Sequence, residues 1–166
     1  MRITHEFQFS AGVAEVLAVL ADPEYVRQKI AISGAQAISA EVVSDELPGF
    51  AVSTKRRVKI SDLPKPAQAF IGSDLEIRQV DVWLEEGPDN CTGTVALEVV
   101  GVPARVTGGM ELRATSGGCV FALNAEIKHT ISSLSFLVAT VESTLRKKII
   151  DTLQAELELV ASWLTK

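Results

Sequence analysis

The chain has 166 residues, of which 47% are hydrophobic, and it carries a formal net charge of −5 at pH 7. This length and composition predict a single domain, residues 1–166, with a sizeable core, and they exclude disordered, collagen-like and repeat architectures. The net acidic charge and the small number of aromatic side chains argue against a nucleic-acid partner, because phosphate binding needs concentrated positive charge and base stacking needs aromatic platforms.

The sequence carries no targeting or metal-binding signature. Its first residues, MRITHEFQFS, contain no long apolar run typical of a signal peptide, and no window approaches the roughly 20 apolar residues of a membrane span. We therefore expect a cytoplasmic protein without a transmembrane segment. Cys91 and Cys119 form neither a CxxC motif nor a metal-ligand spacing, so they are predicted to be free thiols. No nucleotide-binding or hydrolase motif is present, and we expect no cofactor.

The first part of the chain is predicted to form a strand and two short helices. Residues 2–9 alternate between apolar and polar side chains, which is typical of a half-buried strand. Over residues 13–20 the apolar positions are spaced by three and four, which predicts a helix. Asp22 and Pro23 suit the cap and first position of a second helix, which is expected to end near Ile32.

The middle of the chain is predicted to be an antiparallel meander, because its strand-like segments are joined by short breaks rich in Gly and Pro. These segments are 36–44, 50–60, 75–85, 92–100, 104–115 and 119–130. The exception is segment 61–74, which is too long for a hairpin turn and carries two prolines together with Leu63, Phe70 and Ile71. Two interpretations stay open: a mobile lid at the mouth of a cavity, or a rigid loop that completes the core.

The C-terminal region from about Ser135 to Leu164 has apolar residues spaced by three and four, which predicts a long amphipathic helix. An unbroken helix would span roughly 45 Å at 1.5 Å per residue, so we predict a bend or a non-helical start before Glu142. Glu142 and Arg146 are expected to pair on its surface. The buried stripe is expected to comprise Val141, Leu145, Ile149, Leu153 and Leu157.

Seven antiparallel strands present one apolar face, and only the last helix is large enough to cover it, which is the helix-grip arrangement. The opening strand ITHEFQF, the helical stretch SAGVAEVLAVLADPEYV and the closing helix ending ELVASWL resemble the START-like superfamily of lipid-transfer domains, polyketide cyclases and plant pathogenesis-related allergens. Within it, the chain most resembles an uncharacterised actinobacterial group defined only as a domain of unknown function. The resemblance covers the whole chain and implies an α+β domain, with a seven-stranded curved sheet wrapped around a long C-terminal helix. It also implies an elongated cavity that binds apolar small molecules.

Two histidines are candidates for acid–base chemistry. His5 lies on the apolar face of the first strand, and His129 shares a face with Phe121 and Leu123 in the last strand. If these strands pair antiparallel, as in the superfamily, the histidines are expected to approach each other at one end of the cavity and to share proton transfer. The alternative is two unrelated histidines, one satisfied in the core and one at a strand end. Two histidines are too few for a zinc site, so no metal is expected.

Arg56 is the most unusual residue of the predicted inner face. Strand alternation places it inward, between the outward-facing Lys55 and Arg57. A buried guanidinium needs an acceptor. Glu98, which the parity of Ala96 and Val100 places inward, or Asp81 is expected to provide a carboxylate in the free protein. The alternative acceptor is the carboxylate or other polar head of a ligand. A bulge that turns Arg56 outward is the third interpretation.

The orientation of Trp83 stays open. The apolar parity shifts from Leu75 and Ile77 to Val80, which suggests a bulge near Arg78. With a bulge, Trp83 faces outward and favours a homodimer contact or a covering loop; without one, it lines the cavity.

The sequence therefore favours a protein that binds or carries an apolar small molecule such as a lipid, a sterol or a polyketide-like compound. A cyclase- or dehydratase-type enzyme is the first alternative, and a structural or interaction domain with a closed core is the second. The small residues expected to face inward could leave unfilled volume, although Val and Leu elsewhere could close it; they are Ala40, Ala96, Gly108, Ala114 and Ala122. The predicted ligand-binding residues are His5, Phe7, Arg56, Asp81, Phe121, Leu123, His129, Val138, Val141 and Leu145.

Overall fold

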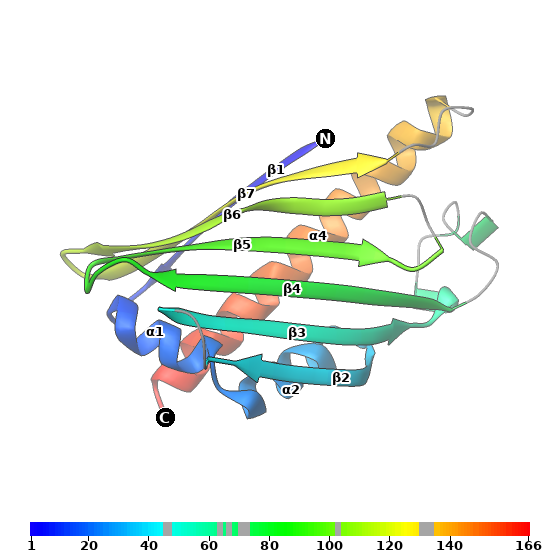
Figure 1. The fold of residues 1–166 in the computed structure, drawn as a ribbon. Coiled ribbons are helices and arrows are strands. Elements are labelled where there is room, and N and C mark those ends of the chain that lie inside the picture. The colour runs from blue at the N-terminus through cyan, green and yellow to red at the C-terminus, as the bar shows by residue number, and fades with distance from the viewer. Residues whose placement is uncertain (45–47, 63–64, 66–67, 70–73, 102–103, 130–134) are drawn as a thin grey trace.

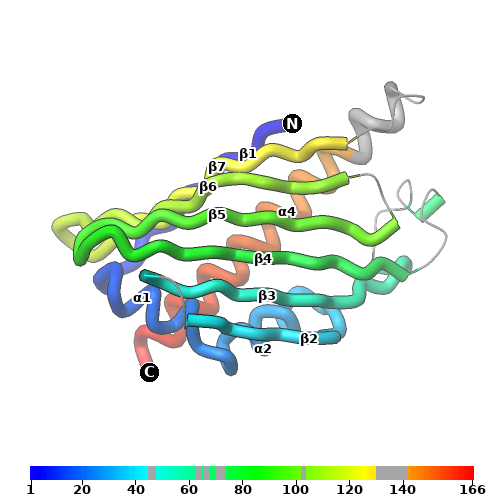
Figure 2. Tube along the Cα trace, in the orientation of Figure 1, coloured from blue at the N-terminus to red at the C-terminus, as the bar shows by residue number. Residues whose placement is uncertain are grey.

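The structure is a computed structural model that describes residues 1–44, 48–62, 65, 68–69, 74–101, 104–129 and 135–166, the stretch 135–141 through its backbone alone. Figure 2 traces the chain. The predicted lid lies largely outside the described residues, as do Leu63, Phe70 and Ile71.

The elements follow the predicted order, with bounds within two residues of those expected from the sequence. They are β1 (Arg2–Phe9), α1 (Val13–Leu20), α2 (Pro23–Ile32), β2 (Gln36–Val43), β3 (Gly49–Val58), the 3-10 turn η1 (Ile60–Asp62), β4 (Leu75–Glu85), β5 (Asn90–Val99), β6 (Ala104–Thr115), β7 (Gly118–His129) and α4 (Ser135–Leu164). Helix α4 runs without interruption from Ser135, so the predicted non-helical start is wrong. No helix in the described part of the chain is both long and apolar enough to cross a membrane.

The seven strands form one antiparallel sheet in the order β1-β7-β6-β5-β4-β3-β2. Strand β1 returns to pair with β7, so the start of the chain forms one edge of the sheet. Helix α4 crosses one face of the sheet diagonally, and α1 and α2 lie near its C-terminal end (Figure 1). Helix α4 packs against α1, α2 and β1. This is the helix-grip fold that the sequence predicts, and the face turned toward α4 is called the inner face below.

Helix α2 begins at the predicted cap. The Asp22 carboxylate accepts hydrogen bonds from the backbone N–H groups of Glu24 at 2.7 Å and Tyr25 at 3.3 Å. Such a cap satisfies N–H groups that have no partner within the helix. The helix buries Tyr25, Val26, Lys29 and Ile30, which lie on one face because they are spaced by one, three and four residues.

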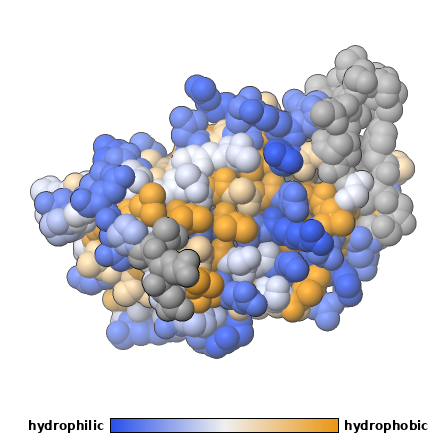
Figure 3. Space-filling model, viewed as in Figure 1, coloured by the Kyte–Doolittle hydropathy of each residue, from blue (hydrophilic) through white to orange (hydrophobic). Residues whose placement is uncertain are grey.

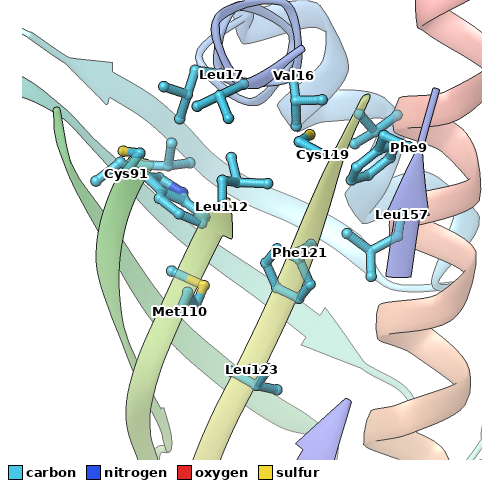
Figure 4. Packing of buried hydrophobic residues seen from close by; sticks show 14 of the residues in the cluster. Phe9, Val16, Leu17, Cys91, Met110, Leu112, Cys119, Phe121, Leu123 and Leu157 are labelled. Atoms are coloured by element: carbon cyan, nitrogen blue, oxygen red, sulfur yellow. The ribbon is translucent and has the colours of Figure 1, made fainter. Parts of the chain in front are cut away.

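One end of the interior is closed by apolar side chains, and we call it the closed end. Val16 of α1, Leu112 of β6 and both cysteines are fully buried there, and neither cysteine forms a disulfide (Figure 4). Trp83 of β4 lies across β5 at Gly93, where an added Cβ would come within 2.9 Å of the indole ring. Glycine at this position therefore lets the ring approach the backbone closely.

The sheet irregularity lies in β2 rather than in β4. Strand β4 pairs with β3 and β5 in unbroken register, so Trp83 points inward and is only 3% exposed. A register shift between Ala37 and Ser39 instead leaves Ile38 45% exposed. The sequence does not show which face of β4 points inward, because both faces of this strand carry apolar side chains. Trp83 therefore offers no contact to a second copy on the outer face.

Strand β5 turns the opposite face inward from the one expected. Val95, Leu97 and Val99 lie on the inner face, whereas Ala96 and Glu98 are exposed on the outer face. The Glu98 carboxylate lies 3.8 Å from Nη1 of Arg78 there. The expectation of an inward Glu98 was wrong, because alternation alone does not say which of two mixed faces meets the core. Ala122 is likewise on the outer face, since its neighbours Phe121 and Leu123 are buried.

Candidate functional site

Polar and charged side chains from four elements meet inside the apolar interior. They are Lys29 of α2, Thr54 and Arg56 of β3, Gln79 and Asp81 of β4, and Glu156 of α4, and we call them the interior cluster. All except the half-buried Gln79 are less than a tenth exposed. Charged groups are rarely buried to this degree unless they are paired or functional.

Hydrogen bonds join four members of the cluster into a chain. Nη2 of Arg56 donates to Oε1 of Gln79 at 3.1 Å. Nε2 of Gln79 donates to both carboxylate oxygens of Asp81, at 2.9 and 3.1 Å. Nζ of Lys29 then donates to Oδ2 of Asp81 at 3.4 Å and lies 3.8 Å from Oε2 of Glu156. Two cations and two carboxyl groups are therefore linked through one amide.

The environment shifts the proton affinities of the cluster. Burial lowers the pKa of Lys29, but the nearby Glu156 and Asp81 carboxylates outweigh burial and raise this pKa, so the ammonium stays charged. Burial raises the pKa of Glu156 even though Lys29 and Arg56 lie nearby. The Glu156 carboxyl therefore accepts a proton more readily than an exposed glutamate does.

Two donors of the cluster lack an acceptor from the described part of the chain. Nη1 of Arg56 and Oγ1 of Thr54 are buried and form no hydrogen bond there, and their residues lie two apart on the inner face of β3. Arg56 is 6% exposed. Buried donors are nearly always paired in folded proteins, so two neighbouring unpaired donors make this part of β3 a candidate binding site.

An apolar row lies directly beside these donors. Ile77 of β4 stands opposite both Arg56 of β3 and Val99 of β5, and Gln79 stands opposite Thr54 and Leu97. Ile77, Val95, Leu97 and Val99 are only half-buried, although they lie on the inner face. We call these four residues the accessible row. The cluster and the row together place polar donors at one side and accessible apolar surface at the other.

Arg56 and Asp81, both predicted from the sequence, belong to the cluster, but they do not pair directly. Arg56 donates to the amide of Gln79, which in turn binds Asp81. The expectation of a carboxylate partner for Arg56 was therefore wrong in detail. Burial of Arg56 on the inner face agrees with the strand alternation, and Lys55 and Arg57 are exposed on the outer face.

The two predicted histidines do not meet. The register places His5 opposite Leu123, six residues before His129 in β7. Nε2 of His5 lies 2.8 Å from Oε1 of Gln154, whereas Nε2 of His129 contacts the carboxylate of Glu142. The two helix partners are twelve residues apart, or about 18 Å at 1.5 Å per residue. Glu142 thus pairs with His129, and not with Arg146 as expected.

The remaining predicted residues are part of the core or cannot be placed. Phe121 and Leu123 are buried, and the Phe121 ring lies 6.3 Å from that of Trp83. Phe7 is half-buried with its ring 4.8 Å from that of Phe9, and Leu145 is half-buried on α4. The side chains of Val138 and Val141 lie outside the described residues.

Sequence reasoning missed Lys29, Thr54, Gln79 and Glu156 as site residues. A signal was present for two of them. Lys29 follows Tyr25 by four residues and precedes Ile30 on the apolar side of α2, and Glu156 falls between Leu153 and Val160 at spacings of three and four. Gln79 shares its parity with Asp81, but the bulge expected near it obscured this.

Two pockets open at the surface. One of about 590 Å³ is formed where Val13 and Leu17 of α1 face Phe50 and residues 85–88. The other, of about 290 Å³, is a depression on the outer face between Lys55, Val80 and Thr107. Its lining also includes Thr54 and Gln79 of the interior cluster and Leu97 of the accessible row. Figure 3 shows this outer face, where apolar and charged residues are mixed. None of the eight predicted ligand-binding residues whose side chains the structure describes lines either pocket.

The comparisons with known proteins agree on the fold. Residues 4–164 match a family described as "Protein of unknown function (DUF2505)". No curated protein matches the chain. Among solved structures, the protein TTHA0849 from Thermus thermophilus superposes with a TM-score of 0.62 at 15% identity, covering 98% of each chain.

Two further structures are of proteins named as enzymes. One domain of the di-domain aromatase/cyclase StfQ from the steffimycin biosynthetic pathway superposes with a TM-score of 0.64 at 12% identity, covering 99% of this chain and 50% of that one. Norcoclaurine synthase from Thalictrum flavum gives a TM-score of 0.58 at 12% identity, covering 99% of this chain and 94% of that one. These superpositions establish a shared helix-grip fold, and at identities this low they establish the fold alone.

Proposed function

The chain belongs to a family of proteins of unknown function, DUF2505, and we propose that it binds a small molecule with a polar head and an apolar body between the sheet and α4. The observation that carries this proposal is the pair of unpaired, buried donors on Arg56 and Thr54. Leaving Nη1 of Arg56 and the Thr54 hydroxyl buried without an acceptor costs stability, so a role in binding explains them better than a role in folding.

The head is expected to accept hydrogen bonds from Nη1 of Arg56 and the Thr54 hydroxyl. The body is expected to lie along the accessible row, since the register places Ile77 beside Arg56 and Leu97 beside Gln79. Burial of this apolar surface would provide affinity, and the two donors would fix orientation. The half-burial of the row supports a ligand-binding interior over a closed core.

The test compares decanoate with 1-decanol by isothermal titration calorimetry. Arg56→Met keeps much of the stem volume but removes the charge and the donors, so we expect decanoate binding to weaken at least tenfold and decanol binding by less than threefold. Arg57→Met is the matched control, because Arg57 is exposed on the outer face one residue further along β3. It should bind both probes as the parent does.

Circular dichroism must first show that Arg56→Met is folded; otherwise Arg56→Lys, which keeps the charge but loses the fork, takes its place. Equal weakening of both probes would contradict the role of Arg56 as the head-binding residue. A parent protein that binds neither probe would overturn the proposed function.

A second candidate function, acid–base catalysis on the bound molecule, is favoured by the raised pKa of Glu156 in the cluster. Two proteins of similar fold are named as enzymes, an aromatase/cyclase and norcoclaurine synthase. Native mass spectrometry of protein purified from its own host would identify a co-purifying ligand. A change in the ligand's mass on incubation with the parent, but not with Glu156→Gln, would indicate an enzyme; an unchanged mass would indicate a carrier.

A further inference from the structure

We propose, building on the function proposed above, that the interior cluster takes a ligand with a singly charged oxygen head, such as a carboxylate, and that Glu156 binds a proton when this head enters. The cluster then accepts the anion and the proton together. The chemical class of ligand is an amphipathic acid.

The charges of the cluster lead to this inference. Lys29 and Arg56 contribute two positive charges, and Asp81 and Glu156 contribute two negative charges when both are ionised. The cluster is then neutral, and an anionic head beside Arg56 would leave one net negative charge in a buried site. Uncompensated charge is costly in an apolar interior, so a proton is expected to enter with the anion.

The contacts of the two carboxyl groups decide which one accepts the proton. Asp81 accepts two hydrogen bonds from Gln79, at 2.9 and 3.1 Å, and one from Lys29 at 3.4 Å. Both oxygens of the Asp81 carboxylate are therefore already occupied by donors. Within the described part of the chain, the Glu156 carboxylate has only the Lys29 ammonium at 3.8 Å, which is beyond hydrogen-bonding distance.

The groups around Glu156 agree with this assignment. Lys29 of α2 and Arg56 of β3 act on it as cations, and Asp81 of β4 acts as an anion. The hydroxyl of Tyr25 on α2 donates a hydrogen bond to the backbone carbonyl of Glu156 at 3.2 Å. Burial raises the pKa of this phenol well above its usual value. Tyr25 therefore stays neutral. His5 of β1 bonds Gln154, close to Glu156 along α4, and is the other titratable group that the test must separate.

The test measures binding of decane-1-sulfonate, whose head stays ionised throughout, between about pH 5.5 and 8.5. Calorimetry in two buffers of different ionisation heat counts the protons bound with the ligand. For the parent we expect uptake of up to one proton, and an affinity that falls by as much as tenfold per pH unit as pH rises through the window in which Glu156 titrates. With 1-decanol we expect neither effect.

Glu156→Gln is expected to bind the sulfonate without proton uptake and with an affinity independent of pH. Glu158→Gln is the matched control, because Glu158 is exposed on the same helix, and it should keep both effects. His5→Gln should keep them as well. Loss of proton uptake in His5→Gln, or its persistence in Glu156→Gln, would overturn the assignment to Glu156.

The proton count in the parent needs no variant, so the inference stays testable even if Glu156→Gln does not fold. Sulfonate binding without proton uptake would overturn the inference and leave the proposed function standing. Absence of binding by both the sulfonate and decanol would overturn the proposed function itself.

Discussion

The closed end and the interior cluster lie in the same interior, yet different forces act in them. At the closed end, Leu112, Cys91 and Val16 are fully buried among other apolar side chains. At the cluster, Lys29 and Glu156 are almost as deeply buried, but burying a charged pair adds little stability over an apolar pair of similar volume. We infer that the closed end stabilises the fold, whereas the cluster is kept for binding.

The strongest way to break this comparison is to remove the central cation of the cluster. Lys29→Met would leave Asp81 and Glu156 buried without the ammonium between them, so we expect a loss of roughly 3–5 kcal/mol in unfolding free energy at pH 7. The loss should shrink as pH falls, because protonation removes the unpaired negative charge. Urea denaturation at pH 7 and pH 5 measures both effects.

Arg27→Met is the control for this variant, because Arg27 lies on the exposed side of the same helix, where it forms an ion pair with Glu24. An exposed pair is worth at most about 1 kcal/mol, so this change should be nearly neutral. Equal stabilities of Lys29→Met and Arg27→Met at pH 7 would show that the cluster charges do not depend on one another.

A pair of leucine truncations tests the closed end against the accessible row. Leu112→Ala should cost roughly 2–5 kcal/mol, because Leu112 is fully buried and its removal leaves a cavity. Leu97→Ala should cost about 1 kcal/mol, because Leu97 is half-buried and part of its surface already meets water. Urea denaturation of both variants decides the matter, and similar losses would remove the distinction between the two regions.

The Glu156→Gln variant is expected to change the pH dependence of stability by a smaller amount. The raised pKa of Glu156 means that the folded protein holds this proton more tightly than the unfolded chain does. Glu156 therefore costs the parent stability as pH rises from the ordinary glutamate pKa through the raised one. The unfolding free energy of Glu156→Gln minus that of the parent should therefore be larger at pH 7 than at pH 5. Urea denaturation at both pH values measures this difference, and the same difference at both would contradict the prediction.

The smallest expected effect is chemical rather than energetic. Burial and the nearby Glu85 and Glu86 raise the pKa of the Cys91 thiol to about 11. At pH 8 its thiolate is then roughly a hundredfold rarer than that of a free cysteine, and access is blocked as well. We expect negligible labelling by an aromatic disulfide reagent in the native protein and rapid labelling in urea. Rapid native labelling of Cys91 would show that the closed end opens readily.

Most of the fold was predictable because its signals are local. Alternation of side chains over residues 2–9, the Asp22-Pro23 cap and the spacing of apolar residues in α4 each specify an element without reference to the rest of the chain. Prediction failed where both faces of a strand carry apolar residues. In β4, Val80 and Leu84 on the outer face suggested a bulge that the unbroken register contradicts.

Less of the candidate site was predictable, and the reason is again the range of the signal. Arg56 was found because strand alternation places its charged side chain on the inward face, where the neighbouring inward positions Val52 and Val58 are apolar. Lys29 and Glu156 come from two helices at opposite ends of the chain, and each alone reads as a polar residue at the edge of an apolar stripe. The pairing of His5 with Gln154 is likewise a contact across nearly the whole sequence.

By itself, the sequence determined the order, type and bounds of the elements, and it indicated that Arg56 lies inside. These properties follow from backbone periodicity and burial, which act over a few residues. Only the tertiary structure decided which face of β5 meets the core, that Gln79 rather than a carboxylate binds Arg56, and that Lys29 lies between Asp81 and Glu156. Strand register and helix docking set these contacts, because they bring together side chains that no local pattern relates.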